Sequence, residues 1–290
     1  MKFATAVVIV FVLAMIYCVY NYFAMQKITV SNYVVSDKRI KKKIRIVHLS
    51  DLHLKEFGEF NGELAKKISE QNPDVVVVTG DMCRRGNKDY TPITQLLEEV
   101  VKTAPVYYAL GNHELDYLKD YNDEILREIK RTGTVILDNE IACLEVKGSK
   151  LKFLGLSWYE ELSEYGINSP EIQEEIKLLN KFCQGDDYKI LLCHYPEYAK
   201  SRYKGKCKEF LNYKFDLMLS GHAHGGLVRL PFIGGVIAPS QGLFPKYDKG
   251  IYDFDGFKLV VSAGLGDTGY FFRVNNPPEI VTVDLVPNEQ

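Results

Sequence analysis

Short apolar runs alternate with amphipathic stretches from Ile44 to the end of the chain. Val75 to Val78 form an unbroken apolar run, which is typical of a strand that is covered on both faces. The stretch 60–72 instead carries apolar residues at helical spacing and ends before Pro73. Strand and helix patterns that alternate in this way predict an α/β or α+β sandwich.

The same patterns assign each predicted element to a residue range. The apolar runs predict strands, each leading into a polar end, at 44–51, 74–81, 105–113, 189–196 and 215–226. The stretch 134–157 predicts three strands with a turn at Gly148–Ser149. Helices are expected at 60–72, 93–101, 120–131 and 171–182. From Leu227 to Val286, glycine, proline and β-forming residues predict hairpins.

The amino-terminal stretch 3–25 has no charge and one strongly polar residue, Asn21. About 20 apolar residues span the core of a bilayer as a helix. The bulky stretch 20–25 lacks the small residues of a signal-peptide cleavage site, so we expect an uncleaved anchor. We therefore divide the chain into an anchor at 1–26, a basic linker with a first strand at 27–43, and a domain at 44–290.

Positive charge follows the apolar stretch and is nearly absent before it. Lys2 precedes it, whereas seven cations follow: Lys27, Lys38, Arg39, Lys41, Lys42, Lys43 and Arg45. The positive-inside tendency predicts a single-pass membrane protein whose domain faces the cytoplasm. The same cations could contact anionic headgroups or belong to a solvated linker and strand edge.

The composition narrows the classes of partner. A formal net charge of −2 indicates no global attraction to nucleic acid, so an acidic substrate would need a local cation. The six cysteines form no CxxC pair and no zinc-finger spacing. We expect reduced, mostly buried thiols rather than a disulfide framework: Cys18, Cys83, Cys143, Cys183, Cys193 and Cys207.

Five of the predicted strands end in clusters of Asp, His or Asn. These clusters hold five of the six histidines; His48 lies inside an apolar run and is expected to be structural. Loops at the carboxyl ends of strands converge on one edge of a sheet. We therefore expect the clusters to meet: Asp51-Leu52-His53, Gly80-Asp81, Gly111-Asn112-His113-Glu114, Cys193-His194 and Gly221-His222-Ala223-His224.

Together the clusters supply what a dinuclear metal site needs. Two divalent cations about 3.5–4 Å apart repel each other, so a carboxylate must lie between them. Asp81 is the candidate bridge, since Gly80 before it allows close backbone approach. Asp51 and His53 are two residues apart, so both can face the same side of a strand end. Each motif alone is weak, but the ordered set indicates a pair of Mn, Fe or Zn ions.

The ordered motifs D-x-H, G-D, G-N-H-E, H and G-H-x-H resemble the calcineurin-like metallophosphoesterase superfamily, from Ile44 to about Val286. The anchor, GHAHGGLVRLP and NNPPEIVTVDL resemble its bacterial membrane-associated branch, which includes proteins similar to UDP-2,3-diacylglucosamine pyrophosphatases and cell-wall-associated phosphoesterases. The resemblance implies an α/β fold, a four-layer α-β-β-α sandwich of two mixed sheets flanked by helices, with one amino-terminal transmembrane helix.

The resemblance also implies a role for each motif residue. One metal would be held by Asp51, His53 and His224, the other by Asn112, His194 and His222, with Asp81 shared. His113 would not be a ligand; it would contact the phosphoryl oxygen and protonate or stabilise the leaving group, while a bridging hydroxide attacks. Glu114 replaces the Asp of many members, which bears on the positioning of His113. On physical grounds, nearby metal ions would disfavour the cationic form of His113 unless a carboxylate such as Glu114 or Asp116 offset their charge.

The function implied is hydrolysis of a phosphomonoester, phosphodiester or pyrophosphate at the membrane surface. A lipid-linked substrate such as UDP-2,3-diacylglucosamine is one alternative, and a soluble or cell-wall phosphoester is another. An inactive scaffold of the same fold would be expected to lose ligands, and a metal-sensing or metal-storing protein would not need His113. The oligomeric state is left open.

An apolar stretch follows the paired histidines, at 230–237 and 243–245. With Trp158 and Tyr159 it could form an acyl-binding wall or a membrane-facing rim. We favour a buried hairpin that closes the second sheet, because exposed apolar patches are uncommon without a partner.

Overall fold

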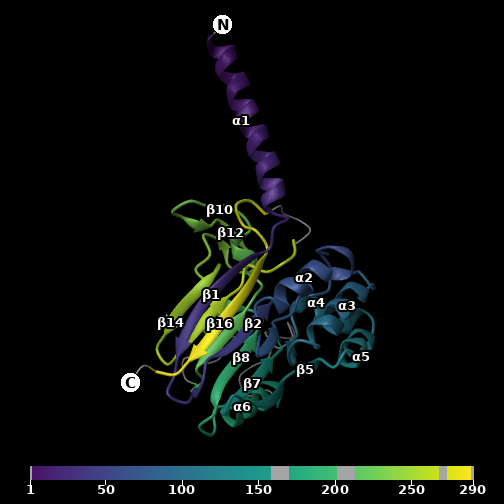
Figure 1. The fold of residues 1–290 in the computed structure, drawn as a ribbon, viewed down its shortest axis with the longest axis vertical. Coiled ribbons are helices and arrows are strands. Elements are labelled where there is room, and N and C mark those ends of the chain that lie inside the picture. The colour runs from purple at the N-terminus through teal and green to yellow at the C-terminus, as the bar shows by residue number, and fades with distance from the viewer. Residues whose placement is uncertain (1, 158–169, 201–212, 268–272, 289–290) are drawn as a thin grey trace.

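The computed structural model describes residues 2–157, 170–200, 213–267 and 273–288, and it is drawn in Figure 1. Trp158, Tyr159 and Cys207 lie outside these ranges. The helices are α1 (Lys2–Ala24), α2 (Gly62–Ser69), α3 (Thr91–Val100), α4 (Asn112–Asp120), α5 (Glu124–Arg131) and α6 (Pro170–Phe182), with short 3-10 turns at η1 (Glu59–Asn61), η3 (Pro196–Ala199) and η6 (His224–Gly226).

The strands form two six-stranded sheets and two small hairpins. The first sheet has the order β1 (Thr29–Ser36), β16 (Glu279–Val286), β2 (Ile44–Leu49), β3 (Val75–Val78), β4 (Val106–Ala109) and β5 (Val135–Leu137). The second has the order β14 (Gly250–Phe254), β15 (Phe257–Val261), β9 (Leu217–Ser220), β8 (Tyr188–Cys193), β7 (Ser149–Leu156) and β6 (Glu140–Val146). The hairpins pair β10 (Arg229–Leu230) with β11 (Gly234–Gly235) and β12 (Ile237–Ala238) with β13 (Gly242–Leu243).

Both sheets are mixed, and each contains four parallel strands. Strands β2 to β5 are parallel in the first sheet, and β7, β8, β9 and β15 are parallel in the second. The carboxyl ends of the central parallel strands therefore lie at one edge of each sheet, the position that the sequence patterns predicted for the polar clusters.

Three hydrophobic cores separate four layers, as predicted. Helices α2 to α5 cover the outer face of the first sheet, for example through Leu64 and Ile93 against Val76. Between the sheets, Val77 lies in one core with Ile190. Helix α6 covers the outer face of the second sheet through Leu179 and Phe182. Since Val76 and Val77 point into different cores, the four-valine strand is buried on both faces.

Two predictions of elements were wrong. We expected residues 105–113 to form one strand with its polar end, but β4 ends at Ala109 and helix α4 begins at Asn112. The carboxyl-terminal region contains hairpins, but β16 crosses to the first sheet. There it pairs in parallel with β1 and antiparallel with β2, a long-range pairing that has no local signal. The basic segment 27–43 contains β1, so the sheet includes residues before Ile44.

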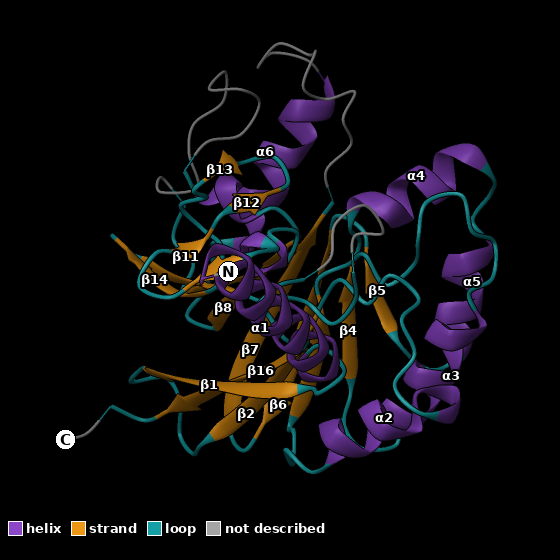
Figure 2. Cartoon of the chain, turned by 90° about the horizontal axis from the view of Figure 1, so that it is seen from above, coloured by secondary structure: helices purple, strands orange, loops and turns teal. Residues whose placement is uncertain are grey.

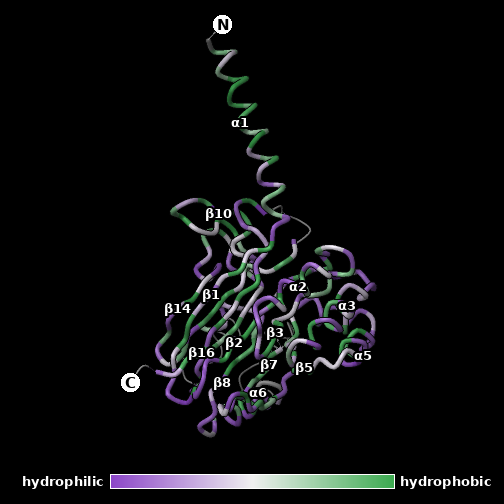
Figure 3. The backbone as a smooth tube through the Cα atoms, viewed as in Figure 1, coloured by the Kyte–Doolittle hydropathy of each residue, from purple (hydrophilic) through white to green (hydrophobic). Residues whose placement is uncertain are grey.

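Helix α1 projects from one end of the sandwich (Figures 1 and 3). The segment Phe3–Ala24 is long and apolar enough to cross a membrane, and the rest of the described chain does not cover it. Its last turns are joined to the domain through Asn21. The Asn21 Nδ2 group donates to the carbonyl oxygen of Arg273 over 3.0 Å, and Asn21 Oδ1 accepts from Asn275 N, also over 3.0 Å.

The cysteines in the described ranges are free thiols, as expected. The expectation that most are buried was wrong: Cys83 and Cys193 are buried, whereas Cys18 and Cys143 are exposed and Cys183 is intermediate. Cys18 lies on the uncovered helix α1, and Cys143 lies on the edge strand β6.

Candidate metal centre

The first sheet places Asp51 and His53 in the loop after β2. Both residues have left-handed backbone, with φ of 53° and 48°. Their amide groups donate to the carbonyl oxygens of Gly80 and Asp81, each over 3.0 Å. We expected the alternation of an extended strand to place these side chains on one side. They share a side instead because of left-handed turns that the neighbouring loop holds in place.

Asp81 follows β3 at a point where two loops touch. A Cβ atom on Gly80 would lie 2.1 Å from the backbone nitrogen of Gly111, so the predicted close backbone approach is confirmed. Asp81 is also left-handed, with φ of 54°, and its Oδ1 accepts from the amide of His113 over 2.8 Å. The carboxylate is thereby held beside the start of α4.

Glu114 joins the loop after β3 to the start of α4. Its buried carboxylate accepts hydrogen bonds from the backbone amides of Asp81, Met82, Cys83 and Gly111 and from the Tyr108 hydroxyl, over 2.7–3.1 Å. The oxygens of Glu114, one of the two carboxylates considered for offsetting the metal charge at His113, are occupied by this backbone clamp. Asp116 instead pairs with Arg85 over 3.1 Å.

The second sheet contributes three imidazoles. His194 follows β8, and its Nδ1 donates to the carbonyl oxygen of Thr79 over 2.6 Å. This bond crosses between the sheets and leaves Nε2 facing the cluster. His222 and His224 follow β9 and are left-handed, with φ of 64° and 47°. The His222 amide donates to both carboxylate oxygens of Asp51, over 3.1 and 3.2 Å.

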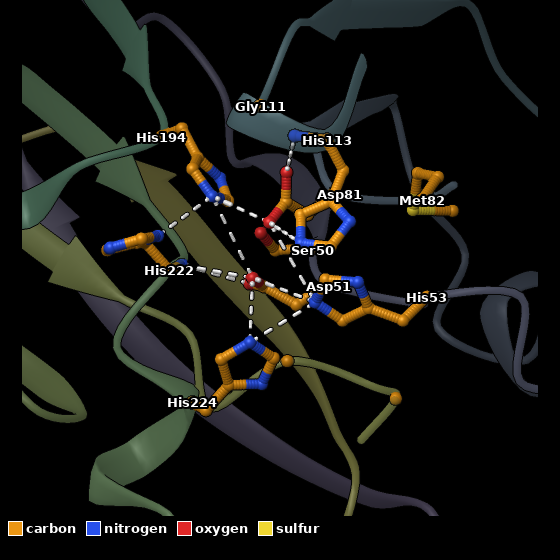
Figure 4. A network of polar contacts seen from close by, with 12 residues as sticks. Ser50, Asp51, His53, Asp81, Met82, Gly111, His113, His194, His222 and His224 are labelled. Carbon is orange, nitrogen blue, oxygen red and sulfur yellow. Dashed lines mark hydrogen bonds and ion pairs between the residues drawn. The ribbon is translucent and has the colours of Figure 1, made fainter. Parts of the chain in front are cut away.

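These side chains converge on two carboxylates, as Figure 4 shows. Asp81 Oδ2 lies 3.2 Å from His194 Nε2 and 3.8 Å from His53 Nε2. Asp51 Oδ1 lies 3.4 Å from His224 Nε2 and 3.9 Å from His53 Nε2. His222 Nδ1 lies 3.3 Å from His194 Nε2. Potential ligand atoms therefore form two adjacent groups, Asp51–His53–His224 and Asp81–His194–His222, and a third group joins His53 and Asp81 to His113.

The donor set fits a pair of divalent ions. Asn112 Oδ1 is buried and has no hydrogen-bond partner among the described residues, which is unusual for an amide oxygen. Two carboxylates and four ring nitrogens face one another within ordinary hydrogen-bond or ion-pair distance. Imidazole with carboxylate and amide oxygen is a set that suits Mn, Fe or Zn.

Burial and charge set the protonation of the cluster. Burial lowers the pKa of His53 and of His222 to about 3, so both imidazoles are neutral, the form that binds a metal. Burial also raises the pKa of Asp51 to about 6. Burial alone would lower the pKa of His194, but the charge of Asp81 and a hydrogen bond to it raise that pKa to about 10. His194 is the group that balances the carboxylates when no metal is bound.

His48 lies outside the cluster, as predicted. Its Nε2 is 2.8 Å from the hydroxyl oxygen of Thr79, and its side chain is fully buried within the first sheet. Burial lowers the pKa of His48 to about 3, so it is a neutral structural histidine.

Sequence reasoning missed Ser240, which supports the cluster from the loop between β12 and β13. The Ser240 hydroxyl lies 2.8 Å from Nε2 of His222, the ring nitrogen that faces away from His194. Sequence reasoning also missed Glu197, which interacts with Ser240. Burial of the Glu197 carboxyl raises its pKa to about 7. A lone serine between Pro239 and Gln241 has no local pattern that would single it out.

Comparison with known proteins agrees with this geometry. A family model described as calcineurin-like phosphoesterase matches residues 44–226, which is more than half of the chain. The chain belongs to the calcineurin-like phosphoesterases. This family uses a dinuclear divalent metal centre, and its members are hydrolases that act on phosphoester bonds.

Several bacterial relatives are metallophosphoesterases by name. The chain is 33% identical to the uncharacterized metallophosphoesterase Cj0846 of Campylobacter jejuni, over 85% of this chain and 60% of that protein. It is 28% identical to an uncharacterized metallophosphoesterase of Aquifex aeolicus, over 92% and 95% of the two chains. It is 25% identical to phosphodiesterase YaeI of Escherichia coli, over 83% and 82%. The chain thus spans less than two thirds of the Campylobacter relative.

Proposed function

We propose that this chain is a membrane-anchored, metal-dependent phosphodiesterase. Asp51, His53 and His224 would hold one ion, and Asn112, His194 and His222 the other, with Asp81 shared between them. The observation that carries this proposal is the convergence of these donors from both sheets around two buried carboxylates, with the Asn112 oxygen unpartnered among the described residues. When bound, the ions polarise the phosphoryl group and generate a nucleophile from water.

His113 is assigned to the leaving group on hydrogen-bond grounds. The backbone amide of Arg85 donates to His113 Nδ1 over 2.7 Å, so the proton of the neutral ring must be on Nε2. His113 Nε2 lies 3.9 Å from Asp81 Oδ2, on the side of the cluster. A protonated Nε2 is a donor rather than a ligand, so it can stabilise a phosphoryl oxygen or protonate the departing alkoxide. The His113 side chain is also one-fifth exposed, whereas His53 and His194 are almost fully buried.

The preference for a diester rests on the relative named phosphodiesterase YaeI. The membrane location rests on α1, since the bonds of Asn21 to Arg273 and Asn275 tie an intact helix to the domain. The excess of cations after α1 supports a domain that faces the cytoplasm. The complete donor set supports an enzyme over an inactive scaffold.

The test is a substrate panel with the full-length chain in detergent. The chain is stripped with a chelator and reloaded with Mn²⁺, Fe²⁺ or Zn²⁺. An aryl phosphomonoester, an aryl phosphodiester and the lipid-linked pyrophosphate UDP-2,3-diacylglucosamine are then compared. We expect chelation to abolish hydrolysis and one of the metals to restore it, with the diester preferred over the monoester. Activity that persists after complete removal of metal would overturn the proposal.

A further inference from the structure

Two short hairpins after the paired histidines expose apolar side chains. Phe232, in the turn between β10 and β11, is 108% exposed. Leu243 and Phe244, at and after β13, are 68% and 64% exposed, and Leu230 and Ile233 are also exposed. Our expectation of a buried hairpin closing the second sheet was therefore wrong. Isolated exposed apolar residues are common, but five on adjoining hairpins indicate a contact surface.

The hairpins lie at the end of the sandwich from which α1 projects (Figures 1 and 2). Asn275 links helix α1 to the first hairpin. Its backbone amide donates to Asn21 Oδ1, and its Nδ2 donates to the carbonyl oxygen of Arg229 in β10. The base of the uncovered helix and the first hairpin are thus fixed relative to each other. A bilayer crossed by α1 would lie directly above the exposed apolar tips.

The hairpins also adjoin the candidate metal centre. Ser240, in the loop between β12 and β13, contacts His222 Nε2 over 2.8 Å. Leu243 is three positions after Ser240 in the chain, so their Cα atoms lie about 11 Å apart at most. One exposed apolar residue, Leu243, is therefore close along the chain to a residue that contacts the cluster.

We propose that the tips formed by Leu230, Phe232, Ile233, Leu243 and Phe244 lie in the interfacial layer of the bilayer that α1 crosses. This second membrane contact holds the metal centre at the level of the lipid headgroups. The inference rests on the anchoring part of the proposed function, and it extends that function by giving the domain a defined face toward the lipid.

The charge beside the apolar tips suits contact with an anionic bilayer. Lys246 follows Phe244 by two residues and is exposed, so a basic side chain adjoins the apolar surface. A basic residue beside exposed apolar side chains suits a surface that contacts an anionic bilayer. The cations at 27–45 were the other candidates for a contact with headgroups, and three of them form ion pairs within the domain. β1 also runs away from α1 before residue 38. Arg39 pairs with Asp37 and Asp216, whereas Lys43 and Arg45 both pair with Asp284.

Contact quenching tests the proposal directly. The full-length variant Phe232→Trp is reconstituted into phosphatidylcholine–phosphatidylglycerol vesicles, with or without bromine atoms on the acyl chains, which quench tryptophan that touches them. Val34→Trp is the matched control, because Val34 is 62% exposed on the edge strand β1. Both variants retain Trp158, so the wild-type signal is subtracted. We expect a blue-shifted emission and a loss of fluorescence in brominated vesicles for Phe232→Trp, and neither change for Val34→Trp.

Three different results would each contradict a different part of the proposals: the second membrane contact, the membrane anchor or the activity. Unquenched emission of Phe232→Trp in a chain that resists carbonate extraction would overturn the second contact. A chain that carbonate removes from the vesicles would overturn the anchor and the contact together. Hydrolysis of a soluble aryl phosphodiester is measured on the same samples; its absence, with quenching retained, would overturn the proposed activity and leave the membrane contact standing.

Discussion

The two sheets contribute different chemistry to the same cluster. The loops of the first sheet supply both carboxylates, Asp51 and Asp81, together with the amide of Asn112 and the imidazoles of His53 and His113. The loops of the second sheet supply imidazoles alone, from His194, His222 and His224. In the proposed site, the negative charge that would attract cations therefore comes from one sheet, while the other would complete the coordination with groups that carry no negative charge.

This division has an electrostatic consequence. Burial raises the pKa of Asp51 to about 6, and the negative charge of Asp81 acts in the same direction. Such a pair is stable only with a cation beside it, either a metal or a protonated histidine. We therefore expect loss of the shared carboxylate of the first sheet, Asp81, to affect both ions, and loss of an imidazole of the second sheet to affect one.

The largest effect is expected from Asp81→Asn, because the shared carboxylate would be lost to both ions. We predict that neither ion is retained and that turnover falls at least about 1000-fold, the equivalent of several kcal/mol of lost transition-state stabilisation. Elemental analysis and aryl phosphodiester hydrolysis measure the two outcomes. Asp284→Asn is the control, a largely buried carboxylate of the same sheet that pairs with Arg45. Two ions per chain in Asp81→Asn would exclude Asp81 as the bridge.

Removal of an imidazole of the second sheet should affect one ion. We predict that His222→Ala and His224→Ala each retain a single ion, since the two histidines belong to different ligand groups. Turnover should fall by more than about 100-fold, above the effect of losing an outer-shell partner. His48→Gln, at a buried histidine outside the cluster, should keep both ions. Loss of both ions in His222→Ala would contradict the division between the sheets.

His113→Ala should separate catalysis from metal binding within the first sheet. We predict that both ions remain while turnover falls about 100-fold, the usual effect of removing a general acid. The loss should be smaller for an aryl ester with a good leaving group than for an alkyl ester, because a good leaving group needs less protonation. An unchanged rate toward both esters would remove His113 from the mechanism.

The smallest effect is expected from Ser240→Ala. The change removes the hydroxyl that holds Nε2 of His222, so the ring can rotate and its Nδ1 is no longer directed at the cluster. We predict about a tenfold weaker affinity for the second ion, as is typical of outer-shell partners. Metal titration of the stripped chain measures this change, and Ser240→Thr, which keeps the hydroxyl, should restore most of the affinity. Equal affinity in Ser240→Ala and wild type would show that the hydroxyl has no positioning role.

The sequence patterns predicted which side chains gather, because a polar cluster at the end of an apolar run is a local signal. They did not predict the backbone that gathers them. Asp51, His53, Asp81, His222 and His224 all have positive φ, which costs free energy for residues other than glycine. Tertiary contacts, such as the amide of His53 on the carbonyl oxygen of Asp81, maintain that conformation, and such contacts cannot be read from neighbouring residues.

Other parts of the site depended on distant contacts as well. Glu114 was noted as a departure from the more usual Asp, but its role as a clamp on four backbone amides became visible only in the folded chain. The position of β16 between β1 and β2 likewise joins residues about 250 apart in the sequence. Local patterns carry no information on pairings of this kind.

The pairing of β1 with β16 also has a mechanical consequence. Helix α1 ends at Ala24 and β1 begins at Thr29, so a pull on the membrane segment reaches the sheet almost directly. β1 and β16 run in parallel with eight residue pairs in register, and a force along β1 would shear their hydrogen bonds together rather than open them one by one. The junction between the membrane segment and the domain is thus stiff, and a force on that segment would tilt the sandwich as a unit before it peeled β1 from β16.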